Sequence, residues 1–188
     1  CWHATFLAMN SFTDKPTIVG ERIVLRPVVP SDAESMWLDL HDEEANRLTG
    51  THDRITRDQV DDWCATRQDE DDRLDLAVVD GTTGEWLGEV VINEWDADNS
   101  CCSFRIALSA PARGHGIGTE ATRLIVAYVF DELPVNRLEL EVFAFNPRAM
   151  AVYEHVGFRA EGRRRQALRW DGEFVDAIMM SIVRSDRV

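Results

Sequence analysis

Residues 113–119 read Arg-Gly-His-Gly-Ile-Gly-Thr and stand between a short strand pattern and a strongly amphipathic helix pattern. The three alternating glycines leave backbone N–H groups uncovered, so a ligand can approach the main chain closely. The helix that follows, roughly residues 116–132, adds the positive end of its dipole at the same turn. The segment therefore predicts an anion site, and specifically a site for a ligand that carries phosphate groups.

Composition places this turn in one folded domain. The chain has 188 residues, 45% of them hydrophobic and 29% charged, which is typical of a globular protein with a sizeable core. Its net charge of −14 argues against nucleic acid or a membrane surface as a partner and favours an amine-bearing substrate through a weak field effect. No apolar run reaches the roughly 18–20 residues that a membrane helix needs.

The cysteines indicate a reducing compartment. Cys1, Cys64, Cys101 and Cys102 form no Cys-x-x-Cys pair and no zinc-ligand spacing. We therefore expect reduced thiols, no metal site and a cytoplasmic location. Met9 precedes a polar stretch and marks a natural start, so we expect residues 1–15 to be a poorly ordered leader and residues 16–188 to form the domain.

Periodicity and capping signals predict the order of the secondary-structure elements. Ser31 and Thr56 are the expected N-caps of two helices, and Glu34 completes a capping box with Ser31. The basic stretch 163–165 is expected to connect two strands. In chain order we expect a strand at 22–26, helices at 31–40 and 56–68, strands at 74–80, 85–93 and 103–108, a helix at 116–132, a strand at 137–143, a helix at 146–155, and strands at 158–162 and 173–183.

This order of elements predicts the fold class. Consecutive strands in the first half indicate antiparallel pairs, whereas the strand–helix–strand unit in the middle implies a parallel pair. We therefore expect a single α+β domain. Its sheet is mixed, mostly antiparallel and twisted, with a central parallel strand pair and helices on both faces.

Two familiar phosphate-binding turns can be compared with residues 113–119. A P-loop needs a lysine after its glycines, and Thr119-Glu120 stands there instead. A dinucleotide fingerprint that begins at Gly116 has Ala121 at its last position and Glu139 near the place of a ribose-binding acid. A strand meander before the turn is unusual for that fold, but the dinucleotide interpretation stays open at this point.

A third interpretation rests on several segments together. Arg113-x-x-Gly116-x-Gly118, after a strand and opening a helix, resembles the pyrophosphate loop of the GNAT superfamily of N-acetyltransferases. Residues 146–158, Asn-Pro-Arg-Ala-Met-Ala-Val-Tyr-Glu-His-Val-Gly-Phe, are similar to the asparagine–tyrosine–Gly-Phe segment of that family. The stretches 21–33 and 161–180 resemble its ribosomal-protein N-terminal acetyltransferase branch, the Rim type. The resemblance covers roughly residues 17–184.

The resemblance implies acetyl-coenzyme A (acetyl-CoA) as co-substrate. Backbone N–H groups of residues 113–119 would bind its pyrophosphate, Arg113 would add charge, and the pantetheine arm would run along residues 104–108. Asn146, also a candidate helix cap, would contact that arm. The implied cofactor-binding residues are Ile106, Leu108, Arg113, Gly114, His115, Gly116, Ile117, Gly118, Thr119 and Asn146.

The resemblance also implies catalytic roles. Tyr153 would protonate the departing thiolate as general acid. Many Rim-type relatives carry a glutamate before a glycine in the strand that precedes the loop, and this chain reads Cys-Ser-Phe-Arg at 102–105 instead. Glu94 and Glu89 are the nearest carboxylates in sequence and are our candidates for the general base.

The expected function is direct transfer of an acetyl group to a primary amine, either a protein N-terminus or a small molecule. The missing strand glutamate leaves a second hypothesis, a non-catalytic module that binds or senses acyl-CoA. Dimers are common among such enzymes, and the sequence leaves both a monomer and a homodimer open. Helices within residues 31–68 and the turn at 170–173 would flank the acceptor, with Trp37, His41 and Trp63 lining its cleft.

Overall fold

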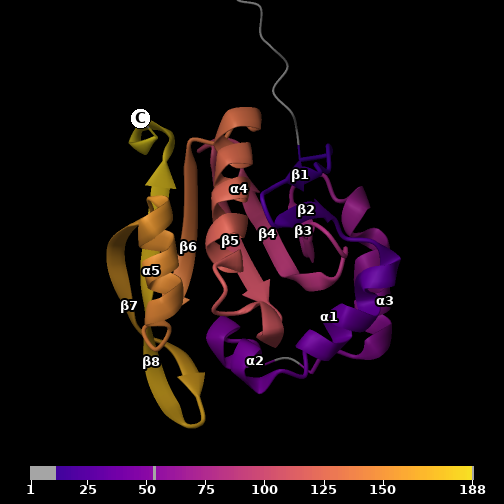
Figure 1. Cartoon of the computed structure of the whole chain (residues 1–188). Helices are drawn as coiled ribbons and strands as arrows, with labels where there is room; N and C mark the ends of the chain where they lie inside the picture. Colours follow the sequence, from indigo (N-terminus) through magenta and orange to yellow (C-terminus); the bar gives the residue numbers. More distant parts are fainter. Residues whose placement is uncertain (1–11, 53, 188) are drawn as a thin grey trace, which may run out of the picture.

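A computed structural model describes residues 12–52 and 54–187 and shows one central sheet flanked by helices (Figure 1). The eight strands lie in the order β1-β2-β3-β4-β5-β6-β8-β7. The strands are β1 (Ile18–Val19), β2 (Ile23–Pro27), β3 (Leu74–Asp80), β4 (Trp86–Asp96), β5 (Cys101–Leu108), β6 (Arg137–Phe143), β7 (Arg159–Trp170) and β8 (Glu173–Val183). The helices are α1 (Ala33–Asp39), α2 (Glu43–Thr49), α3 (Arg57–Thr66), α4 (Ile117–Glu132) and α5 (Pro147–Val156).

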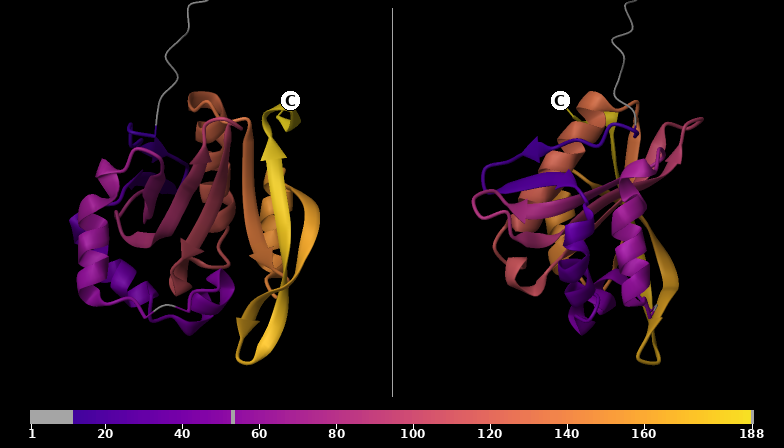
Figure 2. Two further views of the ribbon diagram at one scale, coloured as in Figure 1. Left: turned by 180° about the vertical axis from the view of Figure 1, so that it is seen from behind. Right: turned by 90° about the vertical axis from the view of Figure 1, so that its right-hand side faces the viewer.

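Helices cover both faces of the sheet (Figure 2). The larger core lies under α4 and α5, where Ile125 and Val129 of α4 are fully buried. The smaller core lies under α1 and α3 and contains Val60 and Cys64 of α3. Strand β3 contributes to both cores in alternation, so all of residues 74–79 are buried. Apart from Asp75, these residues are apolar, which is the expected sequence signature of a strand covered on both faces.

The expected fold class is confirmed. Every pair of neighbouring strands in the described sheet is antiparallel except β5 and β6, which are parallel. A doubly wound dinucleotide fold repeats parallel strand–helix units, so this topology excludes the dinucleotide interpretation. None of the helices in the described part of the chain is long and apolar enough to cross a bilayer.

The expected helix starts were correct for Thr56 and wrong for Ser31. Thr56 caps α3 in a reciprocal capping box with Gln59. The chain around Ser31 instead forms a 3₁₀ turn, Pro30–Asp32, before α1 begins. There the buried Asp32 accepts the N–H of Val29 at 2.9 Å and pairs with Arg26 at 2.7 Å. Asp32 therefore stands at the N-cap position of α1, but its side chain does not cap that helix.

Two elements differ from the expectation in ways that affect the pocket. Helix α2 was not expected at all. Strand β7 continues through the basic stretch 163–165, because its backbone pairs with β8: Arg163 lies opposite Ile178 and Arg164 opposite Ala177. The stretch is therefore part of a strand and not a connection, and its side chains form ion pairs, Arg163 with Asp176 of β8 and Arg164 with Glu141 of β6.

The N-terminal part of the domain begins earlier than expected. Residues 1–11 of the expected leader lie outside the described residues. Phe12, only 3% exposed, packs against Trp95 with ring centroids 5.1 Å apart. Lys15 donates to the carbonyl oxygens of Glu70 and Arg73 at 2.5 and 2.6 Å. Residues 12–15 therefore belong to the folded domain.

Candidate active site

A pocket opens where the two parallel strands separate. Strands β5 and β6 pair only at Cys101–Arg137, Cys102–Leu138 and Ser103–Glu139. Beyond these pairs the β5 edge that faces β6 has no strand partner in the described part of the sheet. A pocket of about 920 Å³ occupies the gap and is walled by both strands, α2, α5 and the glycine turn. The backbone groups of residues 104–108 are thus available to an extended ligand.

The glycine turn forms one end of this pocket. Gly114 and Gly116 have φ values of +86° and +81°, which residues with a side chain rarely adopt. Gly116 is also the N-cap of α4, and no side chain caps the helix there. The N–H groups of the first helical turn therefore remain available to an anion, as the sequence pattern predicts.

Several arginines lie near the turn, but Arg113, which the sequence indicated as the charge for the phosphates, is already paired with carboxylates. The guanidinium of Arg113 is paired with Asp42 and Glu44 and donates to the carbonyl oxygen of Leu108 at 2.9 Å. Arg22 donates to the carbonyl oxygen of His115 at 2.8 Å. Arg148 of α5 lies against Gly114 and lines the pocket, with no ion pair among the described residues. The unpaired cation at this end of the pocket is therefore Arg148 and not Arg113.

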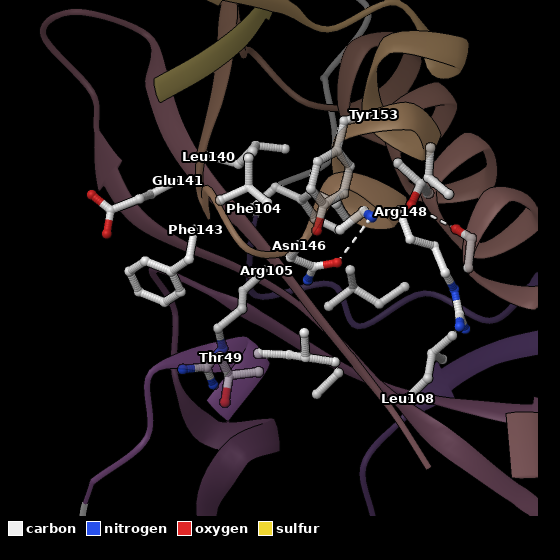
Figure 3. Close-up of a pocket in the computed structure, with 18 of the residues that line it drawn as sticks. Thr49, Phe104, Arg105, Leu108, Leu140, Glu141, Phe143, Asn146, Arg148 and Tyr153 are labelled. Atoms are coloured by element: carbon white, nitrogen blue, oxygen red, sulfur yellow. Dashed lines mark hydrogen bonds between the residues drawn. The ribbon is translucent and has the colours of Figure 1, made fainter. Parts of the chain in front are cut away.

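Helix α5 presents two polar side chains to the pocket (Figure 3). Asn146 caps the helix, because its Oδ1 accepts the N–H of Ala149 at 3.1 Å, while its amide nitrogen points into the pocket. Tyr153, two turns later, has its ring packed between Phe104 and Phe158. Its hydroxyl points toward the pocket interior, and burial raises the pKa of Tyr153 to about 12. The hydroxyl is therefore protonated at neutral pH.

The two candidate carboxylates differ in their positions. Glu94 lies in the β4 bulge with φ +55°, lines the pocket, and accepts a 2.6 Å hydrogen bond from the Ser103 hydroxyl. Bulges commonly redirect a side chain toward a functional site. Glu89 does not line the pocket, and one of its carboxylate oxygens is buried without a partner. Burial raises the pKa of Glu89, with Arg105 acting in the opposite direction.

Ten of the 13 site residues that the sequence indicated line this pocket. They are Glu94, Ile106, Leu108, Arg113, Gly114, Gly116, Gly118, Thr119, Asn146 and Tyr153. Glu89 lies outside it, His115 is exposed, and Ile117 is buried in the larger core. Trp37 and Trp63 pack against the smaller core and do not line the pocket, and His41 lines a second hollow on the far side of α2.

Helix α2 and two arginines of the pocket were not predicted from the sequence. Ala45, Leu48 and Thr49 of α2 line the pocket, as do Arg105 and Arg148. A signal for α2 is present in the sequence, since Asp42 caps it and Gly50 ends it in the left-handed conformation. No comparable signal marks the arginines, because their proximity arises from the fold. Among the described residues, no cluster of His, Cys, Asp and Glu has the arrangement of a metal site.

Sequence comparisons agree with this geometry. Residues 22–159 match the model of a protein family described as "Acetyltransferase (GNAT) domain". The chain is 23% identical to the uncharacterized N-acetyltransferase YokL from the SPbeta prophage of Bacillus subtilis, over 89% of this chain and 93% of that protein. It is 31% identical to spermidine N(1)-acetyltransferase of Escherichia coli K12 over 99 residues, 53% of each chain.

Solved structures share the fold at low sequence identity. The crystal structure of spermidine N-acetyltransferase from Vibrio cholerae in complex with CoA and spermine superposes with a TM-score of 0.81 and 20% identity, covering 88% of this chain and 97% of that one. A GNAT-family acetyltransferase from Bacillus anthracis gives a TM-score of 0.79 and 16% identity, with coverage of 90% and 99%. The family match spans most of the chain and includes the glycine turn, the parting strands and α5. The chain belongs to the GNAT acetyltransferase family and is an acetyl-CoA-dependent acyltransferase.

Proposed function

We propose that this protein transfers the acetyl group of acetyl-CoA directly to a primary amine. The observation that carries the proposal is the continuous pocket, which joins the uncapped glycine turn to Tyr153 and Glu94. One end of the pocket suits phosphates. The other end holds a protonated hydroxyl and a carboxylate, the two groups that acyl transfer to an amine requires.

The cofactor end of the pocket suits CoA. The pyrophosphate lies on the N–H groups of the turn from Gly114 to Thr119, and the guanidinium of Arg148 adds positive charge. The pantetheine arm pairs with the free backbone edge of β5 beside Ile106 and Leu108, much as a strand adds to a sheet edge. The Asn146 amide nitrogen donates to the same arm. In this arrangement His115 and Ile117 contribute only their backbone groups.

The chemistry needs a neutral amine and a proton for the departing sulfur. Glu94 removes a proton from the ammonium group, directly or through the Ser103 hydroxyl that it already binds. The amine nitrogen then attacks the thioester carbon, and the C–S bond breaks to release CoA thiolate. Tyr153 gives its proton to the sulfur and regains one from the attacking nitrogen, which loses its second proton as the amide forms. Glu94 releases its proton to solvent. The products are the N-acetylated amine and free CoA.

Glu94 is the better candidate for the base because it lines the pocket beside Ser103, at the last pairing of the parting strands. Glu89 does not line the pocket, and its carboxylate lies 3.5 Å from a guanidinium nitrogen of Arg105, which does. The two carboxylates are therefore assigned different tasks, proton removal for Glu94 and support of Arg105 for Glu89.

Two measurements on the purified protein test this function. Titration calorimetry with acetyl-CoA should show saturable binding, and Gly116→Ala should weaken it. Thiol release from acetyl-CoA should accelerate when primary amines are added, with mass spectrometry detecting a product 42 Da heavier than the amine, the mass that one acetyl group adds. Absence of both binding and thiol release across amines and N-terminal peptides would reject the proposal.

A further inference from the structure

Two arginines in the pocket have no hydrogen-bond partner among the described residues. Arg113 and Arg164 also line the pocket, but both are bound to carboxylates. Arg105 and Arg148 donate no hydrogen bond to any residue that the structure describes. The chain has 34 acidic and 20 basic residues. Arg148 forms no ion pair with a described residue, and Arg105 forms only a long one, at 3.5 Å from Glu89. Because acids are in such excess, these two pocket arginines point to ligands that supply closer anions.

Arg105 and Arg148 lie at opposite ends of the pocket (Figure 3). Arg148 lies against Gly114 at the phosphate end. Arg105 extends from β5 toward Thr49 of α2, on the side away from Arg148. Arg148 is explained by the phosphates of CoA, whereas Arg105 faces the part of the pocket left to the acceptor.

The charge of Arg105 is poorly compensated by the protein. Its nearest acidic partner is Glu89, and the 3.5 Å between the guanidinium nitrogen and the carboxylate oxygen is longer than a normal hydrogen bond. Burial raises the pKa of that carboxyl, which favours its neutral form. The planar guanidinium therefore remains available for a two-pronged contact with a carboxylate.

We infer that the acceptor is an amino acid, whose carboxylate pairs with Arg105 while its primary amine faces Ser103 and Glu94. The inference rests on the proposed function and specifies its small-molecule acceptor. Ser103 and Arg105 are two residues apart on one strand, so their side chains share a face about 7 Å apart along the chain. One small molecule can reach both.

The same geometry disfavours a polyamine. A second ammonium group would lie against the Arg105 guanidinium, and like charges at close range oppose binding. Apart from Glu94, the carboxylates that line the pocket are already paired with arginines: Glu44 with Arg113, Glu139 with Arg137 and Glu141 with Arg164. We therefore expect the charge of Arg105 to make the enzyme prefer an amino acid over a diamine as acceptor.

The experiment compares amino acids with their amides, which keep the amine and the side chain and lack the carboxylate. Initial rates of thiol release are measured at saturating acetyl-CoA, with spermidine as a third acceptor. We expect kcat/KM for the best amino acid to exceed that of its amide by about tenfold to a hundredfold, the value of a charge-assisted contact. Amides or spermidine used as well as the acids would overturn the inference.

Variants of Arg105 supply the second readout. Arg105→Gln should raise KM for the amino acid about tenfold or more and leave KM for its amide and for acetyl-CoA unchanged, and Arg105→Lys should recover part of the loss. Arg163→Gln removes one positive charge outside the pocket, where Arg163 pairs with Asp176, and should change none of these values. An unchanged KM for the amino acid in Arg105→Gln would contradict the assignment.

Calorimetry separates this inference from the proposed function. If acetyl-CoA binds and amides or diamines are acetylated, the transferase stands and only the amino-acid acceptor is wrong. If acetyl-CoA does not bind and no acceptor promotes thiol release, the proposed function itself fails. If acetyl-CoA binds but no acceptor is acetylated, amino acids are titrated into the CoA complex of the wild type and of Arg105→Gln. Equal binding by the two proteins, or no binding by either, would overturn the inference.

Discussion

Arg113 of the glycine turn is paired with Asp42, the residue that caps α2 on the facing wall of the pocket. The same guanidinium lies 2.8 Å from Glu44 and donates to the Leu108 carbonyl oxygen at 2.9 Å. Its side chain is only 11% exposed. Arg113 thus connects the phosphate-binding turn to the end of β5 and to α2. The same side chain therefore helps to position both the cofactor end and the acceptor end of the pocket.

Replacing Asp42 separates the two tasks of this carboxylate. Asp42→Ala removes both the helix cap and the ion pair, and should lower the free energy of unfolding by about 1–2 kcal/mol. It should also raise KM for both acetyl-CoA and the acceptor, because turn and helix loosen together. Asp42→Asn keeps the cap and removes only the charge, so its loss of stability should be smaller. Urea unfolding and steady-state kinetics measure both effects, and equal losses of stability in the two variants would contradict the capping role.

Gly116 is predicted to be needed for its backbone conformation and for space. An alanine there would adopt φ +81°, and its Cβ would lie 3.2 Å from the Arg22 guanidinium. Gly84 has a similar φ of +73° with nothing within 4 Å of the added carbon, so Gly84→Ala is a matched control. Both variants should lose about 1–2 kcal/mol of stability through backbone strain. Only Gly116→Ala should weaken acetyl-CoA binding in calorimetry, and equal binding by the two variants would argue against the turn as the phosphate site.

The parts of the site that the sequence predicted are those encoded locally. The glycine turn and α5 each depend on neighbours within one or two turns, so glycine spacing, the Asn146 cap and the Gly157 stop were sufficient. Asn146 and Tyr153 are seven residues apart, which two helical turns place on one face. A local signal for α2 existed as well, in Asp42 and Gly50. The helix was not predicted because it is short and lies in an acidic stretch.

The remaining features depend on contacts between distant segments. No neighbouring residue in the sequence indicates an ion-pair partner for Arg113, but Asp42, 71 residues earlier, binds it in the fold. Glu94 and Glu89 were indistinguishable by position, and the β4 bulge separates them by turning Glu94 into the pocket. Arg105 received no role because a strand arginine is ordinarily a solvated residue. Its place in the pocket follows from the parting of β5 and β6, which no local pattern encodes.

Tyr153 is predicted to supply a proton and not binding energy. Tyr153→Phe should lower kcat by about 10²–10⁴-fold, the usual contribution of a general acid, and leave acetyl-CoA affinity unchanged. Because burial raises the pKa of this hydroxyl to about 12, it stays protonated across the neutral range, and its ionisation should not reduce the rate below about pH 10. Tyr128→Phe alters the other tyrosine, which does not line the pocket, and should keep full activity. A Tyr153→Phe variant as active as Tyr128→Phe would remove the tyrosine from the mechanism.

The two carboxylates of β4 should respond differently to the same substitution. Glu94→Gln should lower kcat/KM about a hundredfold or more at neutral pH, and higher pH should restore part of the rate by supplying neutral amine. Glu89→Gln should keep kcat and change mainly KM for the acceptor, because it acts through Arg105. The pH–rate profiles of both variants and the wild type are the measurement. A loss of kcat confined to Glu89→Gln would reverse the assignment of the base.

Glu161 should make the protein sensitive to acid. The hydrogen bond that Glu161 accepts from Arg137, and after it the one from the Ser181 hydroxyl, hold the pKa of Glu161 at about 2, below its usual range. A carboxyl with a lowered pKa in the folded state stabilises the protein above the pKa of the unfolded chain, about 4.3, and that stabilisation is lost as pH falls toward 2. Because the side chain is 45% exposed, the effect should be small, below about 1 kcal/mol.

Glu161→Gln should therefore flatten the decline of the free energy of unfolding between about pH 4.5 and 2, since the uncharged side chain has no proton to gain. Glu154→Gln is the matched control, because Glu154 is exposed on α5 and forms no ion pair with a described residue. Urea unfolding at half-unit pH steps measures the slopes. The Arg137 pairing also bridges β6 and β7, so Arg137→Gln should reproduce the flattened profile. If Glu161→Gln declines as steeply as Glu154→Gln, the acid sensitivity resides in other carboxylates.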